Sequence, residues 1–278
     1  MKKITRRSFL AAAGLTAAAL ALTACGGSSS STASSTASSA AASSEAASSS
    51  AAAELTTVEA GKLTMATNAT FPPYEMTTDT GAFEGIDVDT AQAIAEKLGL
   101  ELQIDDMEFD AALLSVQQGK ADIVMAGVTV TDERKAVMDF SGSYATGIQS
   151  IIVPEGSDIA TPDDLAGKKI GTQRGTTGYI YCSDDFGDEN VVAYDSGLTA
   201  VQALNNGQVD AVVIDNAPAK EYVAANPGLV ILDTSYAEED YAIGMAKGSA
   251  LEDAINAALE ELKADGTLQS IVDKYITA

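Results

Sequence analysis

The residue that most needs a chemical explanation is Arg134, within the stretch AGVTVTDERK at residues 126–135. The chain has 16 lysines and arginines against 40 aspartates and glutamates, so cations are scarce. Thr131 is a good helix N-cap, which would place Arg134 in the first turn of a helix. The positive end of a helix disfavours a cation there, so we expect an anionic group to compensate the guanidinium.

Two kinds of anion could compensate Arg134. One is a neighbouring side chain in the sequence, either Asp132, Glu133 or Asp139. The other is a ligand carboxylate, because a planar guanidinium can bind a carboxylate through two parallel hydrogen bonds. In that case Thr129 could add a hydroxyl group, and the backbone at Gly127 could approach the ligand closely because glycine has no side chain. The local sequence leaves both interpretations open.

Several classes of chemistry are excluded by composition. The chain has no histidine, so serine–histidine and cysteine–histidine catalysis and histidine-bound metals are ruled out. It also lacks a P-loop and a dinucleotide-binding glycine pattern, and the acidic stretch at residues 183–190 lacks the ligand order of an EF-hand. The sequence therefore predicts no metal site and no cofactor. A net charge of −24 also argues against nucleic acid as a partner.

Short apolar runs alternate with amphipathic stretches, which predicts an α/β fold. The first half should contain strands over 62–67 and 121–126, with helices over 87–99 and 109–119. The chain should end in helices over 249–266 and 267–276. The first of these has Ser249 and Glu252 at the spacing of a capping box.

A local design recurs 88 residues later in the chain. The segment at residues 200–215 repeats the helix, glycine, aspartate and strand order of residues 112–127. Gly119 and Asp122 in the first copy match Gly207 and Asp210 in the second, which suggests two similar α/β lobes.

Residues 1–24 have a basic start and an apolar stretch typical of an export signal. The following LTAC resembles the lipobox of bacterial lipoproteins, in which the cysteine, here Cys25, becomes lipidated. TRRSFL near the start resembles the twin-arginine export motif, but an ordinary secretory signal fits as well. Residues 25–54 would then be the lipidated cysteine and a disordered Ser/Ala tether.

Residues from 62 to the end resemble the extracellular solute-binding family 3, the polar amino-acid-binding proteins of ABC importers. The resemblance rests on ordered motifs: TNATFPPYE (67–75), GIDVDTAQAIAEKLG (85–99), MAGVTVTDERKAVMDFSGSY (125–144), DLAGKKIGTQRGTTG (164–178), GQVDAVVIDNAPA (207–219) and LKADGTLQSIVDKY (262–275). It implies a two-lobed periplasmic-binding-protein-like fold of type II. Lobe I would be 55–147 plus 243–278 and lobe II 148–242, with crossing hinge segments near 146–150 and 240–243.

The resemblance also implies how an amino acid would be held between the lobes. Arg134 would bind the α-carboxylate, helped by Thr129 and the backbone of Thr177. Asp215 would take the α-ammonium group, with the Gly127 carbonyl and the Thr129 hydroxyl as further acceptors. Asp215 could instead simply cap the helix that follows it.

The ligand side chain would lie between Phe71 and Phe109, although either ring could be ordinary packing. Asn68 occupies a position where many relatives carry aspartate, which weakens the case for a strictly cationic ligand. Gln173 stands where some relatives carry a polar group that contacts the ligand side chain. Glu75 could restore the missing negative charge if it points inward.

The expected function is therefore an extracytoplasmic, lipid-anchored and monomeric substrate-binding component that delivers a polar or basic L-amino acid to an ABC permease and ATPase. The ligand could be basic, polar neutral or cystine. One alternative is a cyclohexadienyl-type dehydratase on the same fold, for which Glu75 is the candidate acid. Another is an amino-acid sensor or adhesin without a transport role.

Overall fold

A computed structural model describes residues 55–276 of the chain. The expected export signal, the lipidation of Cys25 and the tether lie outside these residues. Within the described range, no helix is both long enough and apolar enough to cross a membrane.

The main sheet has nine strands in the order β5-β1-β6-β12-β7-β10-β8-β9, with β11 paired to β7. Its strands are β1 (Lys62–Thr67), β5 (Glu101–Asp106), β6 (Ile123–Val124), β7 (Met138–Pro154), β8 (Ile170–Gln173), β9 (Val191–Tyr194), β10 (Ala211–Asp215), β11 (Leu229–Ile231) and β12 (Ala237–Ala246). A small second sheet contains β2 (Thr70–Phe71), β3 (Glu75–Thr77) and β4 (Phe83–Glu84).

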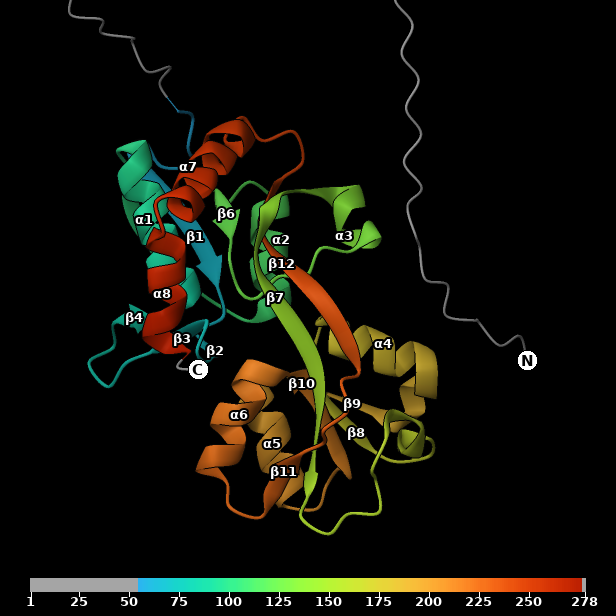
Figure 1. The fold of residues 1–278 in the computed structure, drawn as a ribbon. Helices are drawn as coiled ribbons and strands as arrows, with labels where there is room; N and C mark the ends of the chain where they lie inside the picture. The colour runs from blue at the N-terminus through green and yellow to red at the C-terminus, as the bar shows by residue number, and fades with distance from the viewer. Residues whose placement is uncertain (1–54, 277–278) are drawn as a thin grey trace, which may run out of the picture. The chain divides into compact units, whose positions relative to one another are not determined.

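Eight α-helices surround the sheets in this part of the chain. They are α1 (Ile86–Leu98), α2 (Phe109–Gln117), α3 (Asp132–Val137), α4 (Thr177–Phe186), α5 (Gly197–Asn205), α6 (Asn216–Ala225), α7 (Glu252–Ala264) and α8 (Thr267–Tyr275). The α1, α7 and α8 helices pack together beside β1, whereas α4, α5 and α6 surround the other end of the sheet (Figure 1). The fold is thus mixed α/β with two lobes.

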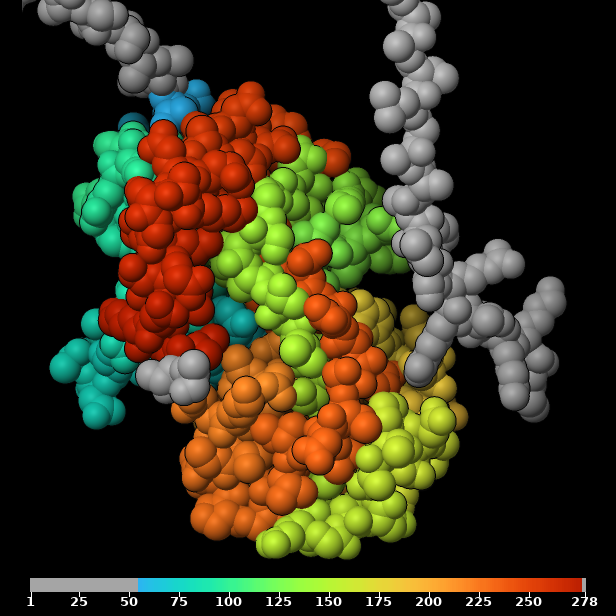
Figure 2. Space-filling model, viewed as in Figure 1, coloured from blue at the N-terminus to red at the C-terminus, as the bar shows by residue number. Residues whose placement is uncertain are grey.

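The two lobes are joined by β7 and β12, which pair antiparallel along most of their length. The C-terminal part of β12 pairs with β6 of the first lobe, and the C-terminal part of β7 pairs with β10 of the second lobe. Figure 1 shows both strands running between the two groups of helices, and Figure 2 shows them side by side at the surface. These strands are the two crossing segments that the family resemblance implies.

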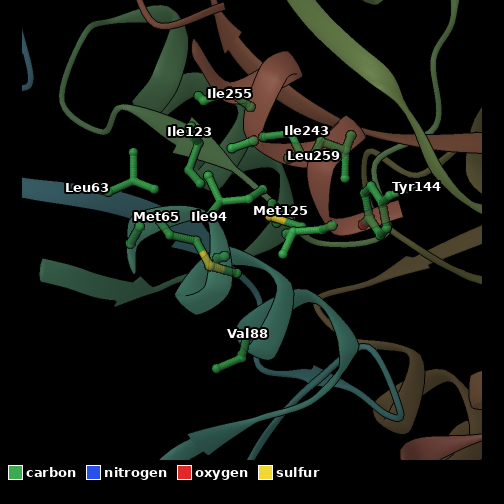
Figure 3. Packing of buried hydrophobic residues seen from close by; sticks show 14 of the residues in the cluster. Leu63, Met65, Val88, Ile94, Ile123, Met125, Tyr144, Ile243, Ile255 and Leu259 are labelled. Carbon is green, nitrogen blue, oxygen red and sulfur yellow. The ribbon is translucent and has the colours of Figure 1, made fainter. Parts of the chain in front are cut away.

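Each lobe buries both faces of its part of the sheet. Along β1, Leu63 and Met65 pack toward α1, α7 and α8, whereas Ala66 packs toward α2. The alternation follows from the period of two in a strand. Figure 3 shows the first of these clusters, in which Ile123 and Met125 meet residues of α1 and α7. In the second lobe, alternate residues of β7 and β10 face α4 or face α5 and α6.

The predicted repeat is present in three dimensions. Asp122 Oδ2 accepts a hydrogen bond of 2.8 Å from the backbone N–H of Thr64, at β1. In the second lobe, Asp210 Oδ2 accepts one of 2.7 Å from the N–H of Lys169, just before β8. The two matching glycines have φ values of 66° and 68°. The repeated aspartate therefore ties the turn after a helix to the start of the neighbouring strand in both lobes.

Two local expectations need correction. The strand predicted over 121–126 is regular only over Ile123–Val124. The capping box at Ser249 and Glu252 is wrong, because Glu252 is itself the first residue of α7 and Leu251 stands at the N-cap. The Ser249 hydroxyl accepts a hydrogen bond from the Leu251 N–H at 3.2 Å, so it closes the turn before the helix instead of capping the helix.

Gly147 lets the two crossing strands pack closely. A Cβ atom at this position would overlap the ring of Tyr241, which is fully buried on β12. We expect Gly147→Ala to lower the free energy of unfolding by about 1–3 kcal/mol, because overpacking forces side chains or backbone to shift. Gly142→Ala is the matched control in the same strand, since its Cβ would meet its nearest neighbour only at 3.6 Å. Equal melting temperatures for the two variants would contradict this role of Gly147.

Candidate ligand-binding site

One cavity between the lobes is lined by all ten residues that the sequence selected. Those residues are Asn68, Phe71, Glu75, Phe109, Gly127, Thr129, Arg134, Gln173, Thr177 and Asp215. Six further residues line the cavity: Ala126, Gln149, Thr176, Val213, Ile214 and Tyr241. The first lobe contributes most of the aromatic rings and Arg134, whereas the second contributes Gln173, Thr177 and Asp215.

Arg134 lies at the start of α3, as predicted. Its backbone N–H donates to the Thr131 hydroxyl at 3.2 Å, which confirms Thr131 as the N-cap. The guanidinium is buried and donates through Nη1 to the Thr129 carbonyl at 2.8 Å and through Nη2 to the Gly175 carbonyl at 3.1 Å. Burial lowers the pKa of Arg134, because removal from water disfavours the charged form.

The local ion pair considered for Arg134 is not formed. Over residues 55–276, none of the ion pairs involves Arg134. Asp139 pairs instead with Lys247 at 2.6 Å, and Asp132 and Glu133 are exposed in the first turn of α3. The side chain of Arg134 points into the cavity, so its sequence neighbours cannot reach the guanidinium. A buried cation is left with two backbone carbonyls and no carboxylate partner within the lobes.

Two aromatic rings, Phe71 and Phe109, line the cavity. The Arg134 guanidinium lies over the Phe109 ring, 5.4 Å from its centroid, a favourable cation–π arrangement. Phe71 stacks on Tyr74 with centroids 5.7 Å apart. A Cβ atom at position 127 would lie 2.9 Å from Phe71 Cε1, and the backbone there has a φ of 55°. Only glycine therefore fits where this backbone approaches the ring.

Asp215 occupies the junction of β10 and α6. Its Oδ1 accepts from the Ala217 N–H at 3.0 Å, and its Oδ2 accepts from the Ile148 N–H at 2.7 Å. The carboxylate is therefore the N-cap of α6, as one interpretation of the sequence held, and it also lines the cavity. Burial raises the pKa of Asp215, while the two N–H donors act in the opposite direction.

Glu239 is a buried acid that sequence reasoning missed. Its Oε2 accepts from the hydroxyls of Thr129 at 3.1 Å and Thr177 at 2.9 Å, and from the Gln149 amide at 3.0 Å. Its Oε1 has no hydrogen-bond partner. Glu239 orients both threonines as donors toward itself, which leaves the lone pairs of their hydroxyl oxygens free to accept.

No sequence signal marks Glu239, because its partners lie between 62 and 110 residues away and only the pairing of β12 with β7 brings them together.

Asn68 and Gln173 bond to each other across the cavity. The Gln173 amide donates to Asn68 Oδ1 at 2.8 Å, and the Asn68 amide donates to the Met107 carbonyl at 2.9 Å. Tyr222 adds a second bridge between the lobes by donating to the Thr70 carbonyl. These bonds, with that from Arg134 to Gly175, hold the lobes closed around the cavity.

Glu75 points inward. Its side chain is fully buried, lines the cavity, and has no hydrogen-bond partner on either carboxyl oxygen. Asp87, also fully buried, lies behind it and accepts a hydrogen bond of 3.0 Å from the Gly127 N–H. Burial and the nearby Asp87 raise the pKa of Glu75 well above its usual range. Burial likewise raises the pKa of Asp87 to about 6, against the lowering effect of the Gly127 N–H.

Two α/β lobes joined by two crossing strands, with a buried cation and buried acids facing one cavity between them, define a solute-binding protein. The chain belongs to the bacterial extracellular solute-binding proteins, family 3, whose model matches residues 63–278.

Named relatives agree with this membership. The L-cystine-binding protein TcyJ of Escherichia coli (strain K12) is 33% identical over 225 residues, covering 79% of this chain and 84% of that protein. A crystal structure of the arginine-, lysine-, histidine-binding protein ArtJ of Geobacillus stearothermophilus has 34% identity and a TM-score of 0.75 over 78% of this chain and 96% of that one. An ancestral arginine-binding protein bound to glutamine has 42% identity and a TM-score of 0.75, covering 78% and 99%.

Proposed function

We propose that this chain is the extracytoplasmic substrate-binding component of an amino-acid ABC transporter and binds a polar or basic L-amino acid between its lobes. The single observation that carries the proposal is the buried Arg134 guanidinium, which faces the same cavity as the buried Asp215 carboxylate. A zwitterion removed from water needs a charged partner at each end. Family membership and relatives named for cystine and arginine support it.

The α-carboxylate would bind at Arg134. A guanidinium has five N–H donors, and two of its nitrogens each use one on a backbone carbonyl, so donors remain for a ligand. Thr177 is the first residue of α4, and the first backbone N–H groups of a helix have no acceptor within the helix. The positive end of α4 would therefore add to the attraction for a carboxylate.

The α-ammonium would bind at Asp215. The Gly127 carbonyl and the Thr129 oxygen would be further acceptors, since the Thr129 proton is directed to Glu239. Phe71 and Phe109 would flank the ligand side chain, with Asn68, Gln173 and Glu75 as the polar groups at its end. Lobe I would comprise 55–147 plus 243–278 and lobe II 148–242, and their closure would present the loaded protein to a permease.

A thermal-shift screen of the twenty amino acids with cystine and ornithine tests the proposed function. A true ligand at 100 times its dissociation constant should stabilise the protein by about 2.7 kcal/mol, because it binds only the folded state. We expect arginine, lysine, histidine, glutamine or cystine to give the largest rise in melting temperature. A screen in which no amino acid shifts the melting temperature would refute amino-acid binding.

The proposal is of a binding protein and not an enzyme. All named relatives above are binding proteins, but Glu75 is a protonatable group facing the cavity and was the candidate acid for a dehydratase. Incubation with prephenate or arogenate, followed by mass spectrometry, separates the two. Recovery of unchanged compound is expected, and conversion would favour the enzyme.

We further propose that the chain acts as a monomer, held at the outer face of the cell membrane by a lipid on Cys25. The sequence LTAC at residues 22–25 supports the lipid. Metabolic labelling with a radioactive fatty acid should mark the wild-type chain and not Cys25→Ala. Equal labelling of both would refute lipidation at this position.

A further inference from the structure

Glu75 and Asp87 form a pair of buried carboxyl groups. The proposed binding of the α-carboxylate at Arg134 and of the α-ammonium at Asp215 uses neither of them. Both side chains are fully buried, and the Gly127 N–H is the one backbone donor among the described residues that reaches either carboxyl group. None of the ion pairs formed within the described lobes involves either residue. Two buried carboxylates side by side cannot both stay ionised without a cation, so the pair retains a proton.

The surroundings of the pair offer no compensating charge. The titratable groups that act on Glu75 and Asp87 are Asp106 at the end of β5, and the phenols of Tyr74 before β3, Tyr144 on β7 and Tyr222 on α6. The phenols are neutral, since burial raises the pKa of each. Asp106 is an acid, so it adds to the repulsion. A cation at this place must therefore come from a ligand.

We propose that Glu75 and Asp87 exchange their shared proton for the cationic side chain of the bound amino acid. This inference rests on the proposed function and assigns its substrate class. A guanidinium or ammonium at the end of the ligand side chain would form an ion pair with Glu75, and the proton would leave to solvent. A neutral amide side chain of similar length would accept a hydrogen bond from the protonated Glu75, and no proton would leave.

The linkage has a defined sign. Since binding of the cationic ligand releases a proton, its affinity rises with pH wherever the ligand-free pair is protonated, by up to about tenfold per pH unit. Above that range the pair is already ionised and the affinity levels off. In that higher pH range the affinity for an amino acid with a neutral side chain falls, because Glu75 has lost the proton that it donates to the ligand.

Isothermal titration calorimetry with L-arginine and L-glutamine, in phosphate and in Tris at the same pH, tests the exchange. Because Tris and phosphate differ in their heats of protonation, the difference between them counts released protons. We expect about one proton for arginine and none for glutamine with the wild-type protein. With Glu75→Gln, arginine should bind more weakly and release none, whereas glutamine should still bind. Glu84→Gln is the matched control on β4, because Glu84 is exposed.

The outcomes separate the two proposals. If arginine binds to the wild-type protein with no proton release, the exchange is refuted and amino-acid binding stands. If neither arginine nor glutamine gives any heat and no amino acid stabilises the protein, the proposed function fails and the exchange fails with it. Arginine that releases the same proton from Glu75→Gln as from wild type would also overturn the assignment.

A second measurement needs no ligand. A carboxyl whose pKa is raised on folding holds its proton more tightly in the folded state, so its stabilising effect is complete at low pH and is lost as pH rises through the folded pKa. For Asp87 that loss falls between its usual pKa of 3.8 and about 6, and for Glu75 it begins at its usual pKa of 4.5 and ends well above it. Denaturant unfolding at several pH values should show this fall for the wild-type protein and a smaller fall for Glu75→Gln. Parallel curves would refute the shared proton.

Discussion

Replacing Arg134 with alanine is expected to weaken amino-acid binding strongly. The guanidinium is buried in the cavity wall and forms no ion pair among residues 55–276, so a bound α-carboxylate would be its direct counter-ion, whereas Glu239 acts on it only from a greater distance. Truncating one member of a buried charge pair costs about 2–5 kcal/mol, because the other charge stays buried and unpaired. The affinity should fall by roughly 30-fold to several thousand-fold, which isothermal titration calorimetry can measure.

The controls for Arg134→Ala separate charge from geometry. Lys135→Ala removes the next cation along α3, which is exposed, and should bind as the wild type does. Arg134→Lys keeps the charge but loses the two-pronged donor, so we expect an intermediate affinity. Because Arg134 also bonds the Gly175 carbonyl of the other lobe, melting curves without ligand should accompany each variant. An unchanged affinity in Arg134→Ala would refute the role of Arg134 as the carboxylate clamp.

Asp215→Asn is expected to lose both binding and stability. The two Asp215 oxygens accept from N–H groups of Ala217 and Ile148, and an asparagine can place an oxygen against only one of them. Its NH2 group would face the other donor, which leaves a buried donor unsatisfied at a cost of about 1–3 kcal/mol. Loss of the charge also removes the counter-ion of the ligand ammonium, with an expected loss of about 2–5 kcal/mol in binding free energy.

Asp210→Asn is the matched control for Asp215→Asn. Asp210 stands just before β10 and accepts an N–H at 2.7 Å from Lys169, at the end of the strand away from the cavity. We expect this variant to lose stability and keep its affinity. An Asp215→Asn protein that melts earlier but binds with wild-type affinity would show that Asp215 is only a helix cap.

Much of the fold follows from local patterns. The helix predicted over 87–99 occupies Ile86–Leu98, and the two terminal helices lie within a few residues of their predicted ranges. The repeat around Asp122 and Asp210 is also found, because an aspartate after a helix turn satisfies backbone donors of the adjacent strand in both lobes. The strand over 121–126 was predicted too long because apolar residues continue past the last ladder pair, where the chain turns into the cavity wall.

The residues lining the site could be selected before the structure was known, because the family motifs place them at the ends of strands and helices. The contacts that these residues make in the folded chain could not be predicted in the same way. The choice between a local ion pair and a free guanidinium at Arg134 depended on which way the side chain points out of α3. Whether Glu75 lies inside or on the surface was likewise open, since an acid near two prolines has no periodic pattern to orient it.

By itself, the sequence determined the alternation of strands and helices, the absence of histidine chemistry and the N-cap at Thr131, because each depends on residue type or short spacing. The set of polar residues around one site came from the resemblance to the family motifs. Only the tertiary structure decided that Glu239 holds Thr129 and Thr177, that Asn68 bonds Gln173, and that Glu75 faces the cavity beside Asp87. Those contacts join positions that are far apart in the chain. The crossing strands and the closure of two lobes bring them together.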